Sequence, residues 1–294
     1  MNIEEEIKKY ELSEEDFEKH ADKIFKFLAM NAKKIENPRF VMVGGQAGSG
    51  KTGLVSKKNN DLEGGAIIID QDEIRASFPE ELYKKILEEH DDREEYLILK
   101  PYVLKMRQAL VDRAREGRYN VIMESAMQAV DSFMPQVKSF KDAGYLADLS
   151  VIAVTNLDCF LSTLNRYSYY LEKDGFCRRN TKMDPQMSVK LRNNLVKLDE
   201  SGLFDNTEIF VRGNSKDEPP QRIYSKSDKT QETPLQALSR GERLSLGSAK
   251  KTFMARASVI REILNKHNDE EKIEQLNWLE GEFKSIEDRR EYHE

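Results

Sequence analysis

Cysteine is scarce in this chain, which limits the kinds of site that the sequence can build. The only two cysteines, Cys159 and Cys177, lie in no C-x-x-C motif and in no Cys/His cluster. Their placement argues against a disulfide framework and against a structural zinc site. We therefore expect two free thiols in a reducing compartment.

Long apolar runs are also missing, and neither sign of charge is in large excess. No apolar stretch approaches the roughly 20 residues that a membrane helix needs, and the charged start lacks the apolar region of a secretory signal. Lysine plus arginine number 47 and aspartate plus glutamate 53, for a net charge of −6. This balance lacks the positive field of a non-specific nucleic-acid binder. We expect a cytoplasmic protein that binds neither membrane nor nucleic acid.

Short apolar, β-branched runs alternate with helical patterns over the first two thirds of the chain. The runs are 39–44, 65–70, 119–125, 149–155 and 207–212. Between them, stretches such as 96–117 place apolar residues at period 3.6 and end at a glycine. Buried strands separated by helices are typical of βαβ units. The expected fold class is therefore α/β, with a parallel sheet flanked by helices.

The composition changes near residue 213. The stretch 213–234 is polar, contains Pro219, Pro220 and Pro234, and has no clear periodicity, which is typical of a connector. Helical patterns return over 235–294. The sequence thus predicts a main domain over 1–215, followed by a connector and a helical C-terminal extension over 216–294.

A glycine-rich motif follows the first predicted strand. Residues 45–52 read G-Q-A-G-S-G-K-T, which satisfies the P-loop pattern G-x-x-x-x-G-K-[ST] between a strand and a helix. Glycine is needed because backbone N–H groups must converge on phosphate oxygens and a Cβ atom would obstruct them. The pattern predicts a P-loop NTPase-type sheet that binds ATP with Mg²⁺, Lys51 reaching the β- and γ-phosphates and Thr52 the metal. The cofactor-binding candidates are Gly45, Gln46, Ala47, Gly48, Ser49, Gly50, Lys51 and Thr52.

Carboxylates follow the next two predicted strands. Asp70 and Asp72 come directly after 65–70, and Glu124 lies at the end of 119–125. The carboxyl ends of parallel strands are where α/β sheets hold ligands, and a carboxylate there can accept a proton from an attacking hydroxyl. Two alternatives stay open: Asp70 or Asp72 caps the next helix, and Glu124 is an exposed strand-end residue. The N-K-x-D motif of guanine-nucleotide switches is absent.

Arginines follow the fourth predicted strand. Arg166 lies in a helical stretch, and Arg178 and Arg179 lie in a polar turn beyond it. Phosphoryl transfer needs positive charge over the γ-phosphate, which small-molecule kinases often carry on a lid. Arginine clusters also occur as ordinary solvated surface, so this assignment rests on their position.

Several segments together resemble the zeta toxins, the kinase half of bacterial epsilon–zeta toxin–antitoxin systems. The resemblance covers about residues 10–215 and rests on the P-loop and on the patterns I-D-x-D, T-L-x-R-Y and S-G-L-F, which here start at Ile69, Thr163 and Ser201. It implies ATP/Mg²⁺-dependent phosphorylation of UDP-N-acetylglucosamine at its 3′-hydroxyl. It also implies an antitoxin partner with a helix over the ATP site.

The resemblance assigns roles to individual residues. It implies that Asp72, by its spacing from Lys51, is the general base and that Glu124 is the strand-end acid. Arg166 matches the arginine of T-L-x-R-Y, and Arg179, in preference to Arg178, matches the lid arginine that clamps the γ-phosphate.

This sequence departs from the family pattern on the acceptor side. Ser125-Ala126-Met127-Gln128 replaces the usual Gly-Thr after Glu124, and Gln108 stands where related toxins can carry a substrate-contacting glutamate. Glu124 and Gln108 are the substrate-binding candidates. A kinase of a different acceptor is the nearest alternative, followed by an ATP-regulated binding module and a nucleic-acid kinase.

Overall fold

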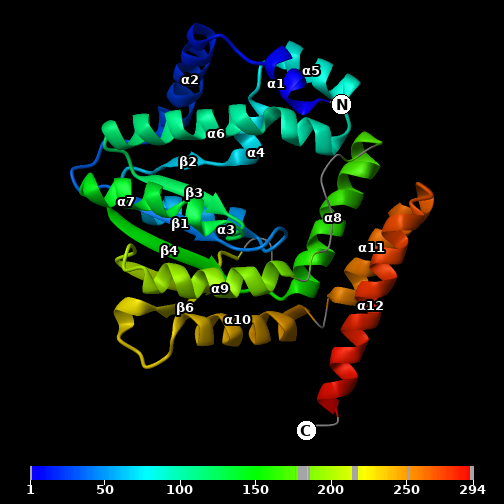
Figure 1. The fold of residues 1–294 in the computed structure, drawn as a ribbon. Helices are drawn as coiled ribbons and strands as arrows, with labels where there is room; N and C mark the ends of the chain where they lie inside the picture. Colours follow the sequence, from blue (N-terminus) through cyan, green and yellow to red (C-terminus); the bar gives the residue numbers. More distant parts are fainter. Residues whose placement is uncertain are drawn as a thin grey trace.

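A computed structural model describes residues 2–175, 177, 184, 186–213, 218–249 and 252–291. The chain forms one six-stranded sheet with the strand order β2-β3-β1-β4-β5-β6 (Figure 1). β1 to β5 pair in parallel, and β6 pairs antiparallel with β5. The strands are β1 (Arg39–Gly44), β2 (Ile67–Ile69), β3 (Val121–Ser125), β4 (Leu146–Ile152), β5 (Asn206–Val211) and β6 (Gln221–Ser225).

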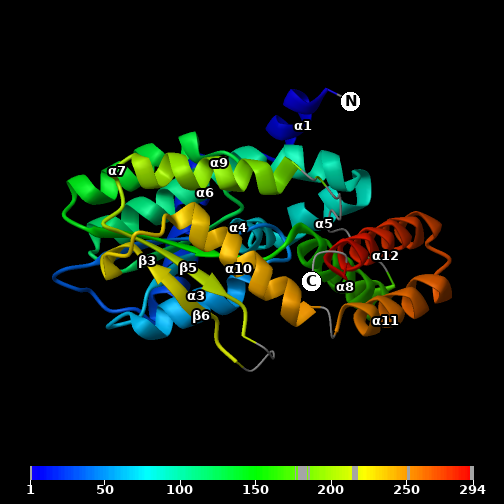
Figure 2. The same ribbon diagram turned by 90° about the horizontal axis from the view of Figure 1, so that it is seen from below.

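Helices cover both faces of this sheet, as the α/β prediction requires. Phe40 and Met42 of β1 face a large core shared with α2, α6, α7, α9 and α10, whereas Val41 and Val43 face α3. The alternation follows from the two-residue period of a strand. Figure 2 shows α6, α7 and α9 on one side of the strands and α3 on the other. The helices are α1 (Ile3–Lys9), α2 (Glu14–Leu28), α3 (Lys51–Asp61), α4 (Gln71–Ala76), α5 (Glu80–Glu89), α6 (Asp92–Glu116), α7 (Met134–Asp142), α8 (Asn156–Asp174), α9 (Gln186–Glu200), α10 (Pro234–Ala249), α11 (Phe253–Lys266) and α12 (Glu270–Glu291).

The five predicted strands are confirmed, with shifted ends. β4 begins at Leu146, three residues before the predicted run, because its first residue lies on the exposed rim of the sheet. β6 was not predicted: it lies within the stretch expected to be a connector. A short strand at the edge of a sheet buries few side chains, so its sequence carries little apolar pattern.

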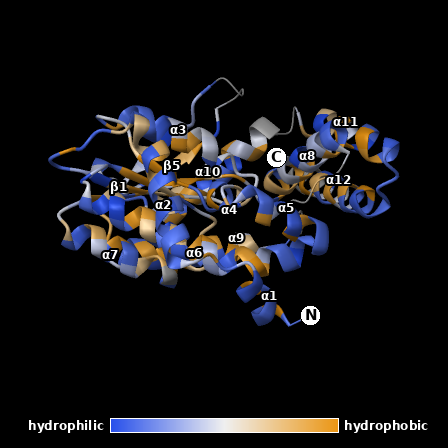
Figure 3. Ribbon diagram, turned by 90° about the horizontal axis from the view of Figure 1, so that it is seen from above, coloured by the Kyte–Doolittle hydropathy of each residue, from blue (hydrophilic) through white to orange (hydrophobic). Residues whose placement is uncertain are grey.

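The C-terminal helices form a second, smaller core. Apolar side chains of α11 and α12 pack against one face of α8, together with Leu246 at the end of α10, while β6 and the rest of α10 pack with the main sheet. Figure 3 shows the apolar stretches of these three helices gathered where they meet. The extension that packs separately is therefore the α11–α12 pair. The division of the chain at residue 215 stays a prediction.

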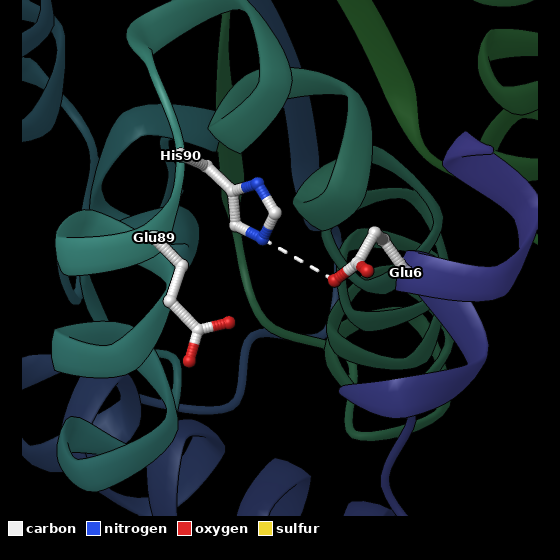
Figure 4. Close-up of side chains that lie close together, drawn as sticks. All are labelled: Glu6, Glu89 and His90. Carbon is white, nitrogen blue, oxygen red and sulfur yellow. Dashed lines mark ion pairs between the residues drawn. The ribbon is translucent and has the colours of Figure 1, made fainter. Parts of the chain in front are cut away.

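Ion pairs link the N-terminal helix α1 to the C-terminal end of α5. His90 Nε2 lies 3.3 Å from Glu6 Oε2, the pair marked in Figure 4, and Glu89 lies beside them. Carboxylates and an imidazole are the donor types of a metal site, but Lys9 Nζ lies 2.5 Å from Glu89 Oε2 and 3.5 Å from Glu6 Oε2. The lysine already supplies the positive charge that the cluster needs.

No described helix combines the length and the apolar character needed to cross a bilayer.

Candidate active site

The P-loop lies between the end of β1 and the start of α3. Gly48 and Gly50 have φ of 76° and 88°, left-handed conformations that favour glycine. A Cβ atom on Gly48 would come within 2.2 Å of the Cys159 carbonyl oxygen on α8. The loop therefore lies directly against α8, and only glycine fits there. Because α3 begins at Lys51, its N-terminal N–H groups open toward the loop, the arrangement that favours an anion.

The side chain of Lys51 folds back over its own loop. Its Nζ donates to the carbonyl oxygens of Gly45 at 2.9 Å and Gln46 at 3.0 Å. Burial lowers the pKa of the Lys51 ammonium, and the positive charge of Arg166 lowers it further, whereas Glu124 opposes the shift. A lysine in this state gains most from a nearby anion, since an opposite charge restores the stability of the charged form.

Carboxylates gather at the same edge of the sheet. Glu124 on β3 pairs in register with Val43 on β1. Burial raises the pKa of Glu124; Lys51 opposes the rise, and Asp70 and Asp72 add to it. The predicted acids and the P-loop lysine therefore act on one another electrostatically.

Asp70 and Asp72 have different local roles. Asp70 is the N-cap of α4, and its Oδ1 accepts a hydrogen bond of 2.8 Å from the backbone N–H of Asp72. The capping interpretation is thus confirmed for Asp70. Asp72 lies in the first turn of α4 with 72% of its side chain exposed and an ion pair of 3.2 Å to Arg75. Its carboxylate remains open to a substrate from solvent.

The remaining predicted residues are not all part of this cluster. Arg166 on α8 belongs to it, since its charge acts on Lys51, and Thr52 is exposed in the first turn of α3. The Gln108 side chain instead donates to Asp112 at 3.0 Å and accepts from Gln136 at 3.2 Å. Arg178 and Arg179 lie outside the described residues.

The segment after Glu124 departs from the family pattern and has an unusual shape. Met127 adopts a left-handed conformation, with φ of 55°, and is fully buried. It packs so closely on the end of β1 that a Cβ on Gly44 would lie 2.2 Å from its sulfur. Asn194 of α9 donates to the Met127 carbonyl at 2.6 Å, which fixes the segment. A left-handed non-glycine residue costs about 1–2 kcal/mol, so this shape is held by its surroundings.

Arg107 of α6 is a further candidate that the sequence analysis did not name. Its guanidinium stacks on the ring of Phe133 at 5.0 Å, close after the Met127 segment. Burial lowers the pKa of Arg107, and Nε is buried without a hydrogen-bond partner among the described residues. A half-buried cation of this kind is a candidate contact for an anionic group.

Arg212, directly after β5, and Asp158, near the start of α8, were also missed. Arg212 donates to the P-loop carbonyls of Gly48 and, at 2.8 Å, Ser49, and its Nη1 pairs with Asp158 at 2.6 Å. The only signal in the sequence was an arginine at the end of a predicted strand, which is too common to identify a contact.

Comparison with known proteins gives a consistent result. The family described as Zeta toxin matches residues 22–218. A toxin zeta of Streptococcus agalactiae is 28% identical over 234 residues, 78% of each chain. Toxin PezT of Streptococcus pneumoniae is 31% identical over 191 residues, 64% of this chain and 74% of its own. A solved structure from a study of the PezAT chromosomal toxin-antitoxin system of Streptococcus pneumoniae has the same fold, with a TM-score of 0.73 at 22% identity over 91% of this chain and 100% of its own.

Proposed function

This chain belongs to the zeta toxin family, and on that premise we propose that it is an ATP- and Mg²⁺-dependent kinase of a nucleotide-sugar hydroxyl, acting in the cytoplasm. The favoured acceptor is the 3′-hydroxyl of UDP-N-acetylglucosamine. The observation that supports this most is that Lys51 and Asp72 both act electrostatically on Glu124 at one edge of the sheet. Phosphoryl transfer requires a phosphate cradle and a base within reach of the same hydroxyl.

The P-loop residues fit a triphosphate. The contact with α8 leaves no room for a side chain at Gly48, and among the described residues Lys51 donates only to carbonyls of its own loop. Lys51 would exchange these carbonyls for phosphate oxygens, and the Thr52 hydroxyl would help to hold the metal. Magnesium, when bound with ATP, would neutralise the phosphate charge.

The carboxylates and arginines divide the remaining work. Asp72, exposed at the start of α4, accepts the proton of the acceptor hydroxyl. Glu124, held by burial with a raised pKa, contacts the acceptor. Arg166 and the lid residue Arg179 stabilise charge on the transferred phosphoryl group.

Arg107 supports an acceptor that carries phosphate. Its half-buried charge has no carboxylate partner among the described residues and lies beside the segment that follows Glu124. A nucleotide-sugar carries a diphosphate, which matches an arginine fork. Gln108, the substrate-binding candidate next to it, contacts α7 instead, so we assign the acceptor contact to Arg107.

The proposed acceptor is tested with a panel of nucleotide-sugars, Mg²⁺ and ATP, read by mass for the gain of one phosphate. UDP-N-acetylglucosamine should gain it fastest. Arg107→Met should raise KM for the acceptor by about tenfold, as loss of one charged hydrogen bond predicts. Arg93→Met, an exposed arginine of the same helix, should not change it. A phosphate gained only by another nucleotide-sugar would make that sugar the acceptor in place of UDP-N-acetylglucosamine. No phosphate gained by any of them would favour an ATP-regulated binding module.

We also propose an antitoxin partner that covers the ATP site. The support is the family and the toxin-antitoxin system named for the PezAT structure. The cognate antitoxin should compete with ATP in a binding assay. ATP binding that is unaffected by a bound antitoxin would contradict this placement.

A further inference from the structure

We propose that Arg256 of α11 is a positioning residue for ATP: through Asp158 and Arg212 it fixes the P-loop in the shape that binds the triphosphate. The C-terminal helices are then part of the nucleotide site. The inference rests on the ATP binding proposed above, and each link is a contact between described residues.

The first link joins Arg212 to the P-loop. Arg212 Nε donates to the Ser49 carbonyl at 2.8 Å, and Nη2 donates to the Gly48 carbonyl. Because a trans peptide places its C=O and N–H on opposite sides, the Ser49 contact turns the N–H of Gly50 away from Arg212. A P-loop binds phosphate through such N–H groups. Arg212 therefore sets the orientation of the loop backbone without touching a ligand.

The second link joins Arg212 to the C-terminal helices. The two oxygens of Asp158 each hold one guanidinium: Oδ2 pairs with Arg212 and Oδ1 with Arg256, both at 2.6 Å. The Ser162 hydroxyl, one turn along α8, accepts from Arg256 at 2.8 Å and from Arg212 at 3.4 Å. The Asp158 side chain is only 6% exposed, so its orientation depends on both arginines.

Apolar packing brings Arg256 to this place. Phe253 of α11 stacks on Phe283 of α12 at 4.1 Å, and Ala257 and Ile260 are fully buried in the cluster with α8. The P-loop lies against the same helix α8, at Cys159. Helix α8 thus contacts both the P-loop and α11, and its Asp158 links the two through ion pairs with Arg212 and Arg256.

The experiment measures Mg·ATP binding directly by calorimetry and, separately, kcat and KM for ATP. Arg256→Gln should weaken ATP binding and raise its KM by about tenfold, a typical coupling between sites, with kcat nearly unchanged. Arg256→Lys, which keeps the charge and the stem, should recover part of the affinity. Arg261→Gln is the matched control, since Arg261 of the same helix pairs with Glu280 of α12 at 2.9 Å.

Three outcomes would overturn the inference. One is wild-type ATP affinity in Arg256→Gln, with folding checked by circular dichroism. Another is an equal loss in Arg261→Gln, which would reveal general loosening of α11. If Arg256→Gln does not fold, Arg256→Met, which keeps the stem and removes the charge, takes its place, and wild-type affinity in that variant contradicts the link. A wild-type chain that binds no ATP is a separate result, because it rejects the proposed function itself.

Discussion

At the scale of single residues, burial decides which groups of the site are reactive. Lys51 and Glu124 are both shifted against their charged forms by burial, and each partly offsets the cost of the other. Removing either charge therefore leaves the other less compensated, which makes single substitutions at these two positions poor tests of role. Burial also disfavours the charged form of Cys159 next to them, and it outweighs the charges of Arg212 and Lys51, which favour the thiolate.

The two cysteines should differ sharply in reactivity. Burial raises the pKa of Cys159 to about 12, whereas Cys177 is partly exposed. Since the thiolate is the nucleophile, Cys159 is inert near pH 8. A thiol reagent at pH 8 should modify one thiol per native chain and both after denaturation. The folded Cys177→Ser variant should show no modified thiol, and its rapid modification would contradict the burial of Cys159.

At the scale of elements, the sheet was predictable and the contacts between its loops were not. Apolar runs and the P-loop pattern are made by residues close together in the sequence. The sequence alone therefore predicted five strands, the P-loop and the capping alternative for Asp70. The contact of Arg212 with Asp158 joins residues 54 apart and has no local pattern. The contact of Gln108 with Gln136 of α7 likewise depends on how α6 and α7 pack, and the substrate-binding role of Gln108 stays a prediction.

The P-loop should tolerate no side chain at Gly48. Gly48→Ala adds a clash with α8 to the strain of a left-handed φ, whereas Gly202, with φ of 69°, has no atom near its Cβ position. Both substitutions should lower stability by about 1 kcal/mol or more, but only Gly48→Ala should weaken ATP binding. Thermal melts and calorimetry give the two readouts. Equal ATP affinities in the two variants would show that the loop can accommodate a Cβ atom at Gly48, which contradicts the structure.

At the scale of the whole molecule, two cores share one helix. The large core follows the sheet and includes Ala237 and Leu238 of α10, and the small one joins Leu246 of the same helix to α8, α11 and α12. The sequence predicted the C-terminal helices by period but not their place, because an amphipathic face does not reveal what covers it. The lid arginine of the prediction, Arg179, lies outside the described residues and stays a prediction.

The small core should contribute measurably to stability. Phe283 is 2% exposed and stacks on Phe253. Phe283→Ala should therefore lower the free energy of unfolding by about 3–5 kcal/mol. Trp278 on the same helix is 44% exposed, so its replacement should cost much less despite its larger side chain. Urea unfolding of the two alanine variants measures both losses in the free energy of unfolding. Similar losses would mean that α12 does not pack as described.

We propose above all that the P-loop and the acid at the start of α4 form one phosphoryl-transfer site. The most direct measurement compares Mg·ATP binding and the transfer rate to the accepted nucleotide-sugar in wild type and Asp72→Asn, with Asp61→Asn, on the exposed end of α3, as control. Asp72→Asn should bind ATP normally and transfer phosphate about 10²–10⁴-fold more slowly, while the control should match wild type. Transfer by Asp72→Asn at the wild-type rate would contradict it.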